Sequence, residues 1–308
     1  MYEHLGQKKR SYLDIISYLI IERTNSIHGE DPSGVYFNKA FSLFNHYHGK
    51  RFGISVPHCW YRWGDEVVRS CLSRDVVWDH QERTRVRWDG DRLEVQDKEL
   101  VSTIGSIIRK HPMDKEGTKN MIKEVYSYAP YDFQRTFLEL RDTIDSLSTL
   151  DRGLEDLSVG ILQRLKDRAF SQYHTERLCD HDSFNIWSEL FDRLVDTSDY
   201  KLLKETNETF WFEFCYHLRI KENENVPRPV LEYWKDNLDY DSRNMYNQLI
   251  DYARILKDQN VKLSEDLLVR IRDREEERRM IDELIEELYD GKETIDIEKN
   301  YTYRSKLM

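Results

Sequence analysis

The chain has few of the features that identify an enzyme. Its 308 residues include only four cysteines, which have no CxxC spacing: Cys59, Cys71, Cys179 and Cys215. This scarcity argues against a disulfide framework and a zinc ribbon, so we expect the cysteines to be reduced and mostly buried. There is no phosphate-binding loop, no dinucleotide-binding glycine fingerprint and no Gly-x-Ser-x-Gly sequence. We therefore expect no cofactor, and an enzyme is the less favoured interpretation.

The sequence also has no long apolar run. The best candidate, residues 12–21, contains Asp14 and Ser17 and is far shorter than the roughly 18 residues that a membrane-spanning helix needs. The N-terminal segment carries Lys8-Lys9-Arg10 but reaches no small-residue cleavage site, as a signal peptide would. We expect a cytoplasmic protein that does not attach to membranes.

Charge is distributed unevenly along the chain. The composition, 39% hydrophobic and 34% charged, is that of a globular protein with long solvated helices. Residues 1–112 contain 17 basic and 15 acidic residues, whereas residues 113–308 contain 30 basic and 43 acidic residues. An acidic body repels nucleic acid, so any nucleic-acid binding would be confined to the first part.

Residues 83–96 hold the clearest strand signal. Asp89-Gly90 lies between alternating residues, which predicts a β-hairpin with a two-residue type I′ turn. In that register one face is apolar and packs inward: Val86, Trp88, Leu93 and Val95. The opposite face is basic: Arg83, Arg85, Arg87 and Arg92.

The basic face suggests an anion-binding surface. Arg87 would lie directly opposite Arg92, and like charges in that position destabilise a strand pair unless an anion neutralises them. These four arginines are therefore our candidate nucleic-acid or anion-binding residues. The alternative is a solvated face that Asp91 and Glu94 partly neutralise.

The first 112 residues have the element order of a winged helix. Apolar spacing predicts helices over 7–23, 35–48 and 65–73, an additional strand over 76–78, then the hairpin. Asp97 is a plausible N-cap for a further helix that runs to His111.

Part of this region also resembles the helical antitoxin-like domains of the SocA (Panacea) type. The resemblance covers about a quarter of the chain and rests on a lysine inside a hydrophobic helix, a proline, an aromatic pair and a glycine before paired valines: Lys39, Pro57, Trp60-Tyr61, Gly64 and Val67-Val68. Gly64-Asp65 stands where those domains carry Gly-Pro. The resemblance implies regulation or neutralisation of a partner rather than catalysis, and it assigns no functional residue.

The remaining sequence predicts helix after helix. The expected ranges are 118–128, 131–150, 154–173, 183–195, 198–221, 229–238, 242–258 and 264–289. We expect a mainly α protein in three parts: a winged-helix-like module with one β-hairpin (1–112), an extended helical bundle (113–225) and a C-terminal helical region (226–308). The two prolines of 223–229 mark the last boundary.

The last predicted helix differs from the others. Its apolar stripe starts at Leu267, Leu268 and Ile271, is interrupted by the charged segment 272–279, and resumes further on: Ile281, Leu284, Ile285 and Leu288. A helix of this kind projects from a bundle or pairs with a partner. Leu284, Ile285 and Leu288 are therefore our candidate partner-binding residues, the alternative being a surface helix that bridges two packed ends.

Two clusters contain metal-ligand residue types without a known metal-site spacing. They are His174, Cys179, Asp180, His181 and Asp182, and His46, His48, His58 and Cys59. We assign no metal to either, and interpret Asp180 and Asp182 as capping or loop residues. The Arg-x4-6-His pattern of helical ribonucleases occurs at Arg168–His174, but similar matches are expected by chance from this composition.

Two hypotheses from different classes remain. The first is a non-enzymatic regulatory or interaction protein, in which the winged-helix-like module sits on an acidic helical scaffold that binds protein partners. The second is a nucleic-acid-binding regulator that uses the basic hairpin face. A winged helix serves either purpose, and the sequence leaves a homo-oligomer open.

Overall fold

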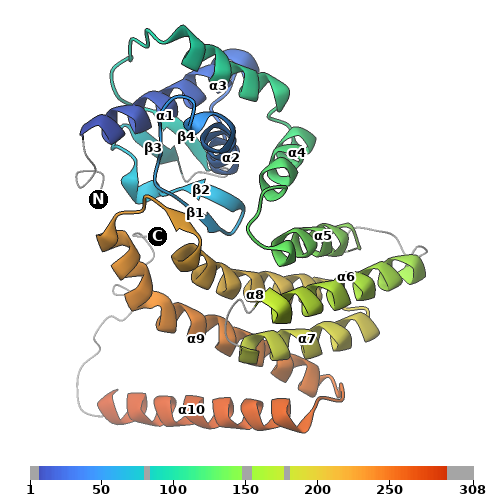
Figure 1. Ribbon diagram of the computed structural model, residues 1–308. Helices are drawn as coiled ribbons and strands as arrows, with labels where there is room; N and C mark the ends of the chain where they lie inside the picture. Colours follow the sequence, from blue (N-terminus) through green and yellow to red (C-terminus); the bar gives the residue numbers. More distant parts are fainter. Residues whose placement is uncertain (1–6, 80–83, 148–154, 177–180, 290–308) are drawn as a thin grey trace. The chain divides into compact units, whose positions relative to one another are not determined.

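The computed structural model confirms a mainly α protein with a small β-hairpin, and describes residues 7–79, 84–147, 155–176 and 181–289 (Figure 1). The chain divides into two compact units, residues 1–246 and 247–308. The first unit thus contains the predicted parts 1–112 and 113–225 and the start of the predicted part 226–308. The helices that the structure describes are all too short or too polar to cross a membrane.

The N-terminal part of the first unit surrounds one central helix. Its elements are α1 (Gln7–His28), α2 (Gly34–Phe44), β1 (His58–Tyr61), β2 (Gly64–Val67), β3 (Val76–Asp79), β4 (Arg85–Trp88), α3 (Lys98–Lys110) and α4 (Lys115–Tyr126). Helix α2 packs against α1, α3, α4 and β2 and is buried on nearly all sides. It continues into a π-helical turn over Asn45–Gly49, so the predicted helix over 35–48 is confirmed.

The strand pairing of β4 differs from the hairpin that the sequence predicts. β4 pairs antiparallel with β3, with Val77 opposite Arg87, and residues 91–97 form no strand. The other edge of β4 is also occupied, because Val86 N donates to Pro32 O and Gly34 N donates to Thr84 O. The predicted Asp89-Gly90 turn is therefore wrong: neither edge of β4 is free for residues 92–95.

Glycine and packing explain two further features of this region. Gly90 allows a close approach, since a Cβ there would lie 2.7 Å from Asp75 Cγ. Gly64 has φ +99°, and a Cβ would lie 2.9 Å from the ring of Tyr126. This tight turn lets β2 fold back on β1, where the sequence predicted a helix over 65–73.

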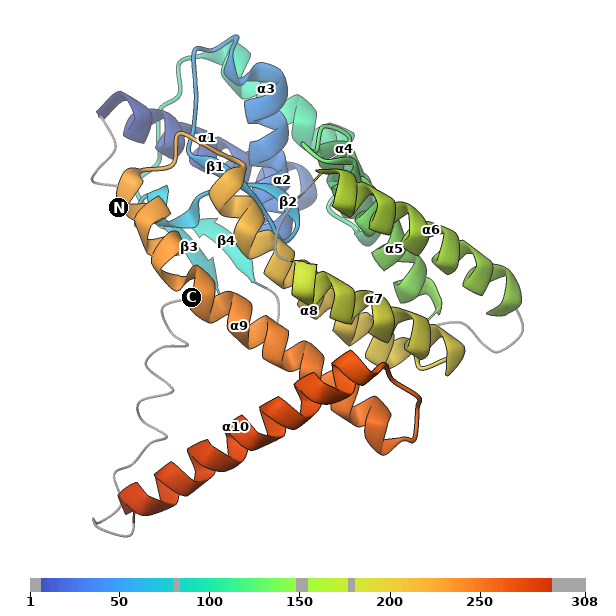
Figure 2. The ribbon, with the colours of Figure 1, turned by 60° about the horizontal axis from the view of Figure 1, so that its bottom comes forward.

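A bundle of four helices forms the rest of the first unit's core. α5 (Asp132–Leu147), α6 (Glu155–Glu176), α7 (His181–Asp196) and α8 (Tyr200–Lys221) lie side by side in Figures 1 and 2, and α5 packs on α6 as α7 packs on α8. Aromatic rings fill the interior, where the Trp187 and Phe210 rings stack with centroids 4.7 Å apart. Trp187 is fully buried.

The short strand β5 (Asn223–Glu224) follows α8 and joins the small sheet, whose strand order is β2-β1-β5. The long helix α9 (Arg228–Asp258) comes next. It replaces the two helices that the sequence predicts over 229–238 and 242–258, because no glycine and no proline interrupts residues 230–258.

The second unit contains the last turns of α9 and the helix α10 (Glu265–Tyr289). Ser264 caps α10, since its hydroxyl accepts from Leu267 N. Leu267 and Ile271, at the start of α10, are buried.

Candidate protein-binding surface

The second half of α10 exposes a stripe of large apolar side chains, which we call the α10 apolar face: Met280, Ile281, Leu284 and Ile285. Their exposed fractions are 55%, 45%, 56% and 44%. Met280 and Leu284 are one helical turn apart, as are Ile281 and Ile285, so the four share one face. Of the predicted partner-binding residues, Leu284 and Ile285 belong to this face, and Leu288 lies in the same helix.

Ion pairs between α9 and α10 hold the second unit together. Arg278 lies 2.5 Å from Asp251, and Lys257 lies 3.5 Å from Glu275. All four side chains are partly exposed, so each pair contributes at most about 1 kcal/mol. Buried apolar residues, such as Ala253 and Leu256, also contribute to the stability of the second unit.

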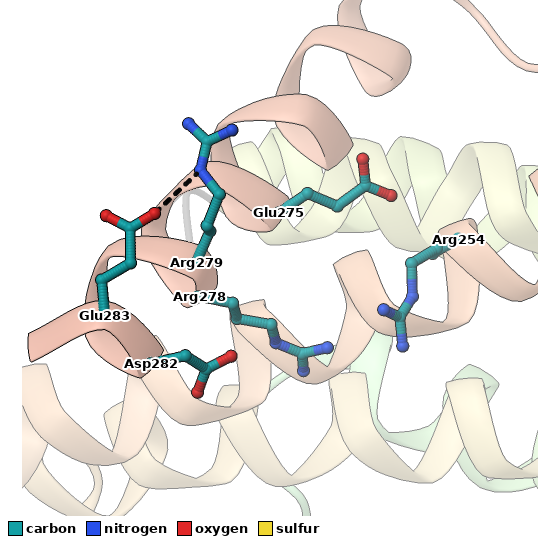
Figure 3. Close-up of a pocket in the computed structure, with 6 residues that line it drawn as sticks. All are labelled: Arg254, Glu275, Arg278, Arg279, Asp282 and Glu283. Carbon is teal, nitrogen blue, oxygen red and sulfur yellow. Dashed lines mark ion pairs between the residues drawn. The ribbon is translucent and has the colours of Figure 1, made fainter. Parts of the chain in front are cut away.

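A charged cleft lies between the same two helices (Figure 3). It has a volume of about 540 Å³ and is lined by Arg254, Glu275, Arg278, Arg279, Asp282 and Glu283. Arg279 lies 3.7 Å from Glu283 along α10. Arg254 and Asp282 form no ion pair with any residue that the structure describes, so each can take a charged group of a partner.

A second cavity, of about 290 Å³, lies in the first unit between the π-helical turn, α3 and α4. Here the charged groups satisfy one another: Lys110 Nζ lies 2.7 Å from both carboxylate oxygens of Glu124, and His111 Nε2 lies 3.2 Å from one of them. In the cleft of the second unit, by contrast, Arg254 has no ion-pair partner among the described residues. The second unit is therefore the better candidate for a docking surface.

The structure describes three of the four candidate arginines, and their environments differ. Arg83 lies outside the described residues. Arg85 is engaged, with one guanidinium nitrogen 2.5 Å from Glu30 Oε2 and the other 2.6 Å from Asp31 O. Arg87 and Arg92 are exposed but are not opposite each other, because β3 is the partner of β4. The repulsive pair that motivated anion binding is thus absent from the described strands.

The predicted apolar face of the hairpin is buried only in part. Val86 is fully buried, but Trp88, Leu93 and Val95 are only half-buried. The rings of Trp88 and Tyr18 of α1 form a T-shaped pair, with centroids 5.6 Å apart.

Side chains of the two clusters of metal-ligand residue types contact aromatic rings or are buried. Within the described residues, no three His, Cys, Asp or Glu side chains are placed to hold a metal ion. His46 stacks on Tyr128 with ring centroids 3.7 Å apart, and Cys59 is buried. In the other cluster, Cys179 and Asp180 lie outside the described residues, while His174 contacts the Phe184 ring.

A buried polar network surrounds Asp65, and the sequence did not predict it. Lys39 Nζ, which is fully buried, donates to the Asp65 carbonyl oxygen at 2.7 Å. Ser42 Oγ donates to Asp65 Oδ2 at 2.7 Å, and the Tyr128 hydroxyl lies 2.7 Å from Ser42 Oγ. His58 Nδ1 lies 2.7 Å from Asp65 Oδ1. Only the position of Lys39 in a hydrophobic helix signalled this network in the sequence.

Electrostatics show what the network does. Burial lowers the pKa of Lys39, although Glu66 and Asp65 oppose that shift. Burial would also lower the pKa of His58, but hydrogen bonds and charge from Asp65 and Glu224 outweigh it and raise the pKa. Lys39 Nζ, Ser42 Oγ and His58 Nδ1 all contact Asp65. The network therefore connects α2, β1 and β2.

Comparisons of the chain with protein-family models, with curated proteins and with solved structures found no match.

Proposed function

We propose that this protein is a non-enzymatic regulatory or interaction protein that binds a protein partner through the α10 apolar face. The observation that carries the proposal is the exposure of four large apolar side chains on one stripe of a helix. Apolar exposure of this kind, bordered by charged residues, is typical of protein interaction sites.

The energetics favour a partner that covers this face. Burying a large apolar side chain contributes about 1.5–3 kcal/mol, and these four are only about half covered. Covering all four side chains therefore contributes several kcal/mol to the free energy of binding, before the cost of association is subtracted. Arg254 and Asp282, which form no ion pair among the described residues, line the cleft beside the face and offer charged contacts that determine the orientation of a partner.

The test is affinity capture with the full chain and with the double variant Leu284→Glu/Ile285→Glu. We expect the double variant to lose the specific partner, because two carboxylates would be buried at the interface. The matched control is Arg272→Ala/Glu276→Ala, which changes two exposed side chains of α10 and removes only surface ion pairs. Retention of the same partners by the double variant would refute the proposal.

A further inference from the structure

We infer that the segment that docks on the α10 apolar face is a basic amphipathic helix of a partner protein. This inference rests on the proposed function, because it specifies the chemistry of the partner at the same face. It is carried by the charges around Met280, Ile281, Leu284 and Ile285 and by the end of the helix to which they belong.

The charged residues of the segment that carries the apolar face are all acidic, and the two arginines that precede it, Arg278 and Arg279, are already paired with carboxylates. Residues 280–289 contain four carboxylates and no lysine or arginine: Asp282, Glu283, Glu286 and Glu287. Asp282 is exposed and has no ion-pair partner among the described residues. Among the residues that the structure describes, the ion-pair partner of Glu283 is Arg279, at 3.7 Å. A partner that covers the apolar face therefore approaches a negative rim and needs positive charge to match it.

The C-terminal end of α10 adds to the negative electrostatic potential of the rim. The C-terminal end of a helix carries a partial negative charge, and a basic residue in the last turn commonly compensates it. The last turn of α10 has no basic residue. A lysine or arginine of the partner would supply that compensation as well as neutralise the rim.

The shape of the face favours a helix as occupant. Its residues recur at intervals of one turn and form a narrow stripe along the helix axis, which matches the stripe of a second amphipathic helix. A second copy of α10 is disfavoured, because its own apolar stripe carries the same acidic rim. The part of α10 before Met280, which holds the arginines of the helix, cannot substitute, since the apolar residues there, Leu267 and Ile271, are buried.

The experiment compares two synthetic helical peptides of about 18 residues with leucine on one face, one carrying lysine and the other glutamate at the polar positions. Binding to the full chain is measured by fluorescence anisotropy. We expect the lysine peptide to bind at least roughly ten-fold more tightly than the glutamate peptide, and added salt to reduce the difference.

Two variants of the full chain separate docking from unspecific charge attraction. Leu284→Glu/Ile285→Glu makes the chain more acidic but destroys the apolar face, so specific docking predicts that the lysine peptide loses affinity. Attraction by charge alone predicts equal or tighter binding, which would overturn the inference. Asp282→Lys/Glu283→Lys keeps the apolar face and should narrow or reverse the preference between the peptides.

The remaining outcomes are equally decisive. Equal or tighter binding of the glutamate peptide, or binding of neither peptide, overturns the basic helix but leaves the proposed function to the capture experiment. Light scattering that shows a dimer of the full chain, dispersed by Leu284→Glu/Ile285→Glu, would identify a second copy as the occupant. Binding of the chain to vesicles of anionic lipid through the same residues would identify a membrane instead.

Discussion

The imidazole of His58 lies between two carboxylates: Nδ1 is 2.7 Å from Asp65 Oδ1, and Nε2 is 3.1 Å from Glu224 Oε2. Asp65 belongs to β2 and Glu224 to β5, so His58, in the middle strand β1, links all three strands of the small sheet. Trp60 N also donates to Glu222 O, at 2.9 Å. The segment after α8 is thus held to the N-terminal part by a histidine that can change its charge.

The first prediction concerns pH. Because the folded pKa of His58 is raised, its contribution to stability is fully present below the unfolded pKa, about 6.5, and is lost as pH rises through the folded pKa. We expect the difference in unfolding free energy between the wild type and His58→Gln to shrink between pH 6 and pH 8.5, as measured by urea denaturation.

Comparing the variant with the wild type isolates His58 from other histidines. Burial lowers the pKa values of His46, His48 and His111, and their contributions to the pH dependence have the opposite sign. The contributions of His48 and His111 occur in both proteins and cancel in the difference. The charge of His58 is one of the causes that lower the pKa of His46, so the His46 contribution cancels only in part. A difference that stays constant over this pH range would contradict the role given to His58.

The second prediction concerns Asp65. The Asp65 side chain is almost fully buried and accepts from Ser42 and His58, so Asp65→Ala leaves the partly buried imidazolium of His58 without its main counter-charge. We expect a loss of about 3–5 kcal/mol in unfolding free energy at pH 6. Glu224→Gln is the control: Glu224 is largely exposed, and its loss should cost less than about 1 kcal/mol. Similar losses for the two variants would show that the network is not centred on Asp65.

The third prediction distinguishes the two strand registers. Val77 and Arg87 are direct partners across β3 and β4, so the pair Val77→Cys/Arg87→Cys should form a disulfide under mild oxidation. The pair Arg87→Cys/Arg92→Cys, which the Asp89-Gly90 turn would place opposite each other, should remain reduced. Mass spectrometry of the oxidised proteins measures both, and rapid cross-linking of the second pair would favour the turn.

The fourth prediction concerns the alternative function, nucleic-acid binding. Arg85 is occupied by Glu30 and Asp31, so among the described arginines of this segment Arg87 and Arg92 are the ones available for phosphate. If the chain binds duplex DNA, Arg87→Ala/Arg92→Ala should reduce the slope of log K against log salt by roughly 2. Arg85→Ala should leave that slope unchanged. Absence of binding at low salt would dismiss the alternative.

Local signals in the sequence predicted much of the fold. Apolar periodicity located most helices, and Asp97 is confirmed as an N-cap, since its Oδ1 accepts from Glu99 N and Leu100 N. Residues 76–78 are a strand as predicted. These features depend on residues within a few positions of one another, which is why the sequence alone reveals them.

Strand pairing could not be read in the same way. Asp89-Gly90 is a strong local turn signal, but contacts with β3 and with residues 32–34 satisfy both edges of β4. The Asp65 network was equally hidden, because His58 and Glu224 are far apart in the sequence and meet only when β5 joins the sheet.

By itself, the sequence determined the helical class of this protein and the apolar stripe of its last helix, because both follow from spacing along the chain. Only the tertiary structure decided that part of that stripe is covered, at Leu267 and Ile271, and part is exposed, at Leu284 and Ile285. It also decided which arginines are free and which carboxylates surround His58. Burial and pairing depend on what other segments bring to a residue, and periodicity along one segment contains no information about that.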